Sequence, residues 1–99
     1  MKRTERDLIP NTPRNIRLDA GMSAADVCSL TGWTASAQSR FERGRTNPKA
    51  STLAVFYAAC GRDDLVAYLT PLMGPSDFSV VQQITRDRAA RFPAVSQRV

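Results

Sequence analysis

The chain has 99 residues, of which 42% are hydrophobic, and its formal net charge at pH 7 is +5. This length suits one small domain, no apolar run is long enough to span a membrane, and the positive balance favours a polyanionic partner. The sequence lacks histidine and has two separated cysteines, Cys28 and Cys60, so we expect buried, reduced thiols and neither a metal site nor a cofactor.

Residues 1–11 are predicted to form a flexible basic arm without a signal-peptide core, so we expect a cytoplasmic protein. The first helix follows at residues 13–20. Thr12 suits the cap position because its hydroxyl can accept a backbone N–H, and Pro13 suits the first helical position. Gly21 is expected to end this helix.

Two short helical patterns come next and are joined by a tight turn at Gly32. Ser23 is expected to cap the first of them, and Asp26 adds negative charge to its first turn. Thr34 is expected to cap the second, which runs to about Arg43. A chain with this pattern projects its second helix outward.

A fourth helix is predicted from a cap near Ser51, and a fifth over residues 63–69. Pro71 and the Gly-Pro pair at 74–75 then break the chain. The apolar residues that the fourth and fifth helices are expected to turn inward are Leu53, Phe56, Tyr57, Cys60, Leu65, Val66 and Leu69.

Residues 76–91 are ambiguous, and a helix capped by Ser76 and Asp77 is favoured over a strand at residues 78–81. Residues from Pro93 onward are expected to be disordered. The predicted organisation is the arm at 1–11, a domain at 12–74, and an extension at 75–99 that supplies a dimerisation element and a basic tail. The predicted inner face of residues 76–91 consists of Val80, Val81, Ile84 and Arg88.

An ordered set of residues runs from the first helix to the end of the fourth, namely Arg17, Gly21-Met22-Ser23, Val27-Cys28, Gly32, Ser39-Arg40-Phe41-Glu42-Arg43-Gly44, Pro48, Thr52-Leu53 and Cys60-Gly61. Over residues 12–70 this set resembles the Cro/C1-type (XRE) helix-turn-helix domain of bacterial and phage repressors. The resemblance implies an all-α, five-helix, lambda-repressor-like fold, here with a short C-terminal extension that can hold a sixth helix. It also implies a repressor that binds double-stranded DNA as a homodimer, reading a pseudo-palindromic operator through the major groove.

The resemblance further implies roles for single residues. Arg17 and Glu42 correspond to a semi-buried ion pair that ties the first helix to the recognition helix. Arg40 is the one residue of that helix capable of a bidentate contact to guanine. The expected base contacts are Ala35, Ser36, Ser39 and Arg40, and the expected phosphate contacts are Thr34, Arg43, Arg45 and Lys49.

Three positions depart from the family pattern. Ala24 stands where a polar residue usually holds a phosphate. Gln38 stands where a core Ile or Val is usual, so either the helix is rolled or the amide reaches a backbone group. Trp33 replaces a smaller residue in the turn and is expected to cover the core.

The expected dimer surface is the fifth helix with Leu65, Tyr68, Leu69 and Leu72, with or without residues 76–91. One alternative is an antitoxin-type autoregulator that binds a partner protein through residues 76–99. A second is a protein-interaction module that has lost DNA binding, to which Ala24 and Gln38 point. We expect no enzymatic activity, because without histidine a Ser or Cys nucleophile lacks its usual base.

Overall fold

Six α-helices and one short 3-10 helix make up residues 12–92, the range that the computed structural model describes. No strand occurs in this range, so the predicted all-α class is confirmed. The predicted arm at 1–11 and the tail at 93–99 lie outside the described residues. The elements in chain order are α2 (Pro13–Asp19), α3 (Ala24–Thr31), α4 (Ala35–Glu42), α5 (Ala50–Ala59), α6 (Asp63–Leu69), the 3-10 helix η1 (Thr70–Leu72) and α7 (Pro75–Arg91).

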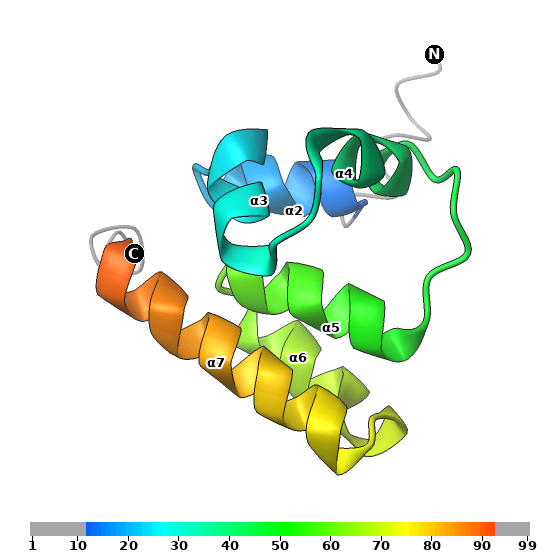
Figure 1. The fold of residues 1–99 in the computed structure, drawn as a ribbon, viewed down its shortest axis with the longest axis vertical. Helices are drawn as coiled ribbons and strands as arrows, with labels where there is room; N and C mark the ends of the chain where they lie inside the picture. Colours follow the sequence, from blue (N-terminus) through cyan, green and yellow to red (C-terminus); the bar gives the residue numbers. More distant parts are fainter. Residues whose placement is uncertain (1–11, 93–99) are drawn as a thin grey trace.

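The helices form two layers (Figure 1). α2, α3 and α4 lie in the upper layer of that view, and α5, α6 and α7 lie in the lower one. α5 joins the layers because it packs against α3 on one side and against α6 and α7 on the other. One cluster of buried apolar side chains results, made of Ile16, Met22, Val27, Leu30, Phe41, Ala54, Phe56, Ala58, Ala59, Cys60, Leu69, Val81 and Ile84.

The first three predicted helix caps are confirmed. Thr12 accepts a hydrogen bond from the backbone N–H three residues on, at 3.4 Å, and Thr34 does the same at 3.1 Å. Ser23 and Asp26 form a reciprocal capping box with both bonds at 3.0 Å. Each bond satisfies a backbone donor that the first turn of a helix leaves unpaired, so the starts of α2, α3 and α4 are defined locally.

The caps predicted for the two later helices are wrong. α5 begins at Ala50, before Ser51, and no side chain caps it. Ala50 already packs against the core, so burial rather than a cap sets this start. α7 begins at Pro75, because a proline at the first helical position has its φ preset for the helix and needs no partner for an N–H.

α7 is a helix of 17 residues, so the strand alternative for this segment is wrong. Val81, Ile84 and Arg88 are buried at helical spacing, whereas Val80, also predicted on the inner face, is exposed. The helix packs along α5 and contributes two residues to the shared core. Residues 75–91 are therefore part of the same packed unit as α2–α6 and not an appendage to it.

Gly61 follows α5 and supports the close approach of α7. Its φ is +75°, in the left-handed region that side chains disfavour. A Cβ built on this glycine would overlap the guanidinium carbon of Arg88. The buried guanidinium therefore lies against the end of α5, where its charge complements the helix dipole, although its Nε finds no hydrogen-bond partner.

Replacement of Gly61 by alanine should lower the free energy of unfolding by more than the ~1–2 kcal/mol of a left-handed alanine, because Arg88 must also move. Gly32→Ala is the matched control, since Gly32 has φ +82° and an added Cβ there meets nothing within 4 Å. Urea unfolding of the two variants measures the difference. Equal losses would show that Arg88 yields without cost.

Candidate nucleic-acid interface

Arg17 on α2 and Glu42 on α4 form a bidentate ion pair. The Arg17 Nε and Nη2 atoms donate to the two carboxylate oxygens of Glu42 at 2.7 and 3.0 Å. The remaining Nη1 donates to the carbonyl of Met22 at 3.0 Å, so the guanidinium also holds the turn before α3. Both charged side chains are about nine-tenths buried, and the hydrogen bond to Glu42 raises the pKa of Arg17. The structure thus contains the ion pair between α2 and α4 that the family resemblance implies.

Gln38 extends this ion pair into a network. Its side chain is 1% exposed, and its Nε2 donates to Glu42 Oε2 at 3.0 Å and to the Ala24 carbonyl at 3.4 Å. Its Oε1 accepts from the Cys28 thiol at 3.2 Å. Of the two sequence-based alternatives, the amide reaches a backbone group. Gln38 thereby links α3 to α4, as Arg17 links α2 to α4.

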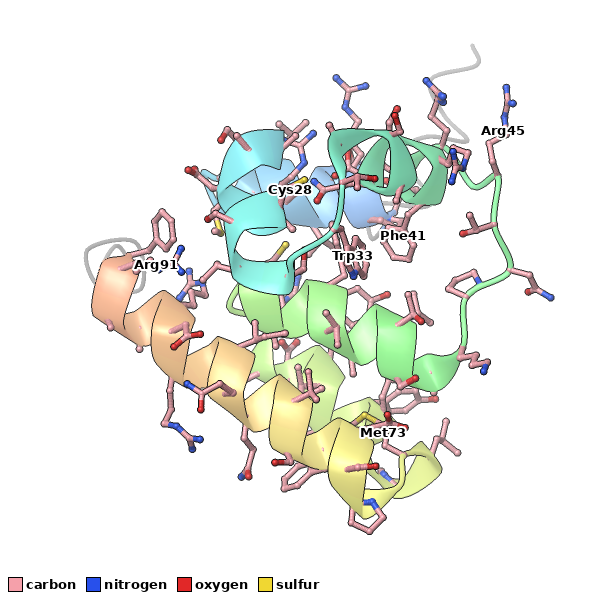
Figure 2. The ribbon with its side chains drawn as sticks, in the orientation of Figure 1. Cys28, Trp33, Phe41, Arg45, Met73 and Arg91 are labelled. Atoms are coloured by element: carbon pink, nitrogen blue, oxygen red, sulfur yellow. The ribbon has the colours of Figure 1, made fainter. Side chains whose placement is uncertain are left out.

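Trp33 packs between the layers at the turn that joins α3 to α4 (Figure 2). Its ring lies edge-on to Phe41 with centroids 5.2 Å apart and is stacked on Phe56 at 6.3 Å. This agrees with the predicted covering role. An indole in this place makes the turn part of the core, so the direction in which α4 leaves the turn is set by packing.

The outer side of α4 is open to solvent. Ala35, Ser36 and Arg40 are exposed, and Ser39 is half-buried near the inner face. Thr34 is exposed too, and its hydroxyl can still donate although its oxygen caps the helix. The helix therefore presents small polar and apolar groups and one arginine.

A basic segment follows α4. Arg43, Arg45 and Lys49 are all exposed. Within residues 12–92 the ion pairs are Arg17–Glu42 and Arg62–Asp64, and neither uses a residue of this segment. Arg45 points away from the α5–α7 layer, on the side of α4 (Figure 2). These cations can therefore reach a polyanion without first breaking an ion pair to another described residue.

Arg14 was not among the residues predicted from sequence. It is exposed and lines a pocket together with Ser39, Arg43 and Glu42. The spacing of Arg14 could have indicated this position from the sequence. Arg14 lies three residues before Arg17 on the same helix, so the two side chains occupy neighbouring parts of one helix face. It adds a cation from α2 to the side of α4 that carries the predicted contacts.

The two thiols are free and occupy different surroundings. Cys60 is buried in the core, and this burial raises its pKa to about 12. Cys28 is half-buried and donates to Gln38. At neutral pH Cys60 is therefore a protonated, apolar side chain and not a nucleophile.

The predicted dimer surface is only partly exposed. Tyr68 and Leu72 are 79% and 69% exposed. Leu69 is buried in the core, so its assignment to an intermolecular surface is wrong, whereas Leu65 is half-buried and packs against the core. Leu65 and Leu69, four residues apart, lie on the side of α6 that packs inward, whereas the Tyr68 side chain is exposed.

A family model described as a helix-turn-helix domain matches residues 14–69, more than half of the chain. The chain belongs to this helix-turn-helix family. The helix-turn-helix domain spans α2 to α6, and the match supports a DNA-binding regulator. No curated protein and no solved structure matches the chain. Among the described residues, none of the helices is long and apolar enough to cross a membrane.

Glu42→Ala should destabilise the helix-turn-helix domain by about 3 kcal/mol, because it leaves Arg17 buried without its carboxylate and removes a partner of Gln38. Asp64→Ala breaks the more exposed ion pair with Arg62 and should cost no more than about 1 kcal/mol. Chemical denaturation followed by circular dichroism measures both. Similar losses in the two variants would contradict a structural role for the buried pair.

Proposed function

We propose that the chain is a sequence-specific regulator of transcription that binds double-stranded DNA and acts as a repressor. The observation that carries the proposal is the contrast between the two sides of α4. The inner side is held by Gln38 and Glu42, while the outer side is free and is followed by exposed cations. A rigid helix with an open outer face suits insertion into the major groove, where base edges are distinguishable.

In this proposal Arg40 reads a base, because its guanidinium can bond both acceptors of guanine. Ala35 contacts a thymine methyl, and Ser36 and Ser39 donate to or accept from base edges. The phosphate contacts come from Thr34, Arg43, Arg45 and Lys49, which supply affinity that falls with added salt.

We propose a homodimer on a pseudo-palindrome whose half-sites lie about one helical turn apart. Tyr68 and Leu72 support this, because two large apolar side chains exposed on neighbouring turns can be buried by a second copy. The buried Leu69 is not part of this surface. Membership of the Cro/C1 (XRE) subtype and a cytoplasmic location belong to the same proposal.

We propose no enzymatic activity. The chain has no histidine, and the Cys60 thiol is buried with its pKa raised to about 12. A serine or cysteine nucleophile therefore lacks its usual base, and one of the two thiols lacks access to a substrate.

The antitoxin alternative assigns residues 76–99 to a partner protein. Residues 75–91 form α7, whose Val81 and Ile84 are buried against the chain's own core, so only the outer face of α7 remains for a partner. Co-purification of a stoichiometric second protein would favour this alternative. Absence of salt-dependent binding to any duplex would instead favour a protein-interaction module.

Selection of bound sites from random duplex DNA tests the proposal. Arg40→Ala should relax preference at one position per half-site and cost about 1–3 kcal/mol on the selected site. Arg45→Ala should weaken all duplexes alike and reduce the slope of log affinity against log salt by about one. Identical behaviour of the two variants would contradict this division of roles.

Leu72→Glu should convert a dimer to a monomer, because it places a charge in the proposed apolar contact. Leu18→Glu is the control, since Leu18 is also exposed but lies on α2, in the other layer. Sedimentation with and without DNA gives the oligomeric state. A wild-type chain that stays monomeric in both conditions would exclude the homodimer.

A further inference from the structure

An open pocket of about 330 Å³ lies between α2, α3 and α4. The pocket borders the outer side of α4, because two of the residues that line it, Ala35 and Ser39, are proposed base contacts. Its lining consists of Arg14, Arg17, Ala24, Ala35, Gln38, Ser39, Glu42 and Arg43.

The charges around this pocket sum to a positive site. Arg17 and Glu42 neutralise each other through their bidentate bond. Arg14 on α2 and Arg43 after α4 remain, and both are exposed. Their positions at the ends of two different helices make the pocket a place where an anion meets two cations from different directions.

The pocket is open because small side chains form two of its walls. Ala24 in the first turn of α3 and Ala35 in the first turn of α4 contribute one methyl group each. A long side chain at position 24 would reach into this space. The small side chain of Ala24 therefore has two consequences. It cannot make the usual polar contact with a phosphate, and it leaves the pocket open.

Resting on the proposed DNA binding, we infer that this pocket receives one backbone phosphate in each half-site, held by Arg14 together with Arg43. In a helix-turn-helix motif, here α3, the turn and α4, the first helix crosses the DNA backbone while the second enters the groove. The space between α3 and α4 therefore faces a phosphate and not a base. The guanidinium fork of Arg14 matches two phosphate oxygens, and Ser39 at the wall can donate a third bond. Arg14 takes over, from α2, the contact that Ala24 cannot make from α3.

Arg14→Ala should weaken binding on the order of tenfold on every duplex, as expected for loss of a charge-assisted hydrogen bond. The slope of log affinity against log salt should fall by about one, and the preferred sequence should not change. Arg86→Ala is the matched control. Arg86 is an exposed arginine of α7 whose side chain bonds Gln83 on the same helix, and its loss should leave affinity and slope unaltered.

Duplexes in which single phosphates are replaced by neutral methylphosphonates locate the contact. One replacement per half-site should weaken the wild-type chain at least as much as Arg14→Ala does, because Arg43 loses the same partner. That replacement should weaken Arg14→Ala less than it weakens the wild-type chain, whereas replacements elsewhere should weaken both chains equally. A thermal melt verifies that Arg14→Ala remains folded.

Two failures can be told apart. If the wild-type chain shows no salt-dependent binding to duplex DNA, the proposed function fails and the pocket assignment fails with it. If the wild-type chain binds but Arg14→Ala keeps its affinity and salt slope, only the pocket assignment is overturned. An Arg14→Ala chain that every neutralised phosphate weakens as much as it weakens the wild-type chain would overturn it as well.

Discussion

A single hydrogen-bonded network joins the three helices of the upper layer. Arg17 from α2 and Gln38 from α4 both donate to the Glu42 carboxylate, and Gln38 continues to Cys28 and the Ala24 carbonyl on α3. Because these groups are largely buried, each depends on its partners to offset the loss of water. The relative orientation of α2, α3 and α4, and with it the direction of the exposed side of α4, depends on this network.

The lower layer supports the three helices of the upper layer. α5 lies under the upper helices, and Trp33 carries the contact from the turn to Phe56 of α5. α7 then covers the other side of α5, with the Arg88 guanidinium against Gly61. The 17-residue helix is therefore a support for α5. It also contacts the upper layer directly, because the Arg91 guanidinium donates to the Ser29 hydroxyl of α3 at 3.1 Å.

Under the proposed function, the side of α4 that meets DNA is sparse. Ala35 and Ser36 are too small to discriminate strongly, which leaves Arg40 as the main specific contact. Such a surface relies on DNA shape and on phosphate contacts to position the protein. The pocket beside Arg14 adds to the phosphate contacts, because it draws the DNA backbone toward α2 without contacting a base.

Features that depend on neighbours in sequence were predictable from the sequence alone. The caps at Thr12, Ser23 and Thr34 join groups three residues apart, and the turn at Gly32 needs only its own backbone freedom. The Arg17–Glu42 pair was expected from the family resemblance rather than from local pattern.

Which face of a later helix is buried is decided by partners distant in sequence. Val80 turned outward for this reason, and the placement of Arg14 beside Ser39 and Arg43 came from the packing of α2 against α4. Helical periodicity defines the stripes of a helix, but only tertiary packing selects the stripe that faces the core.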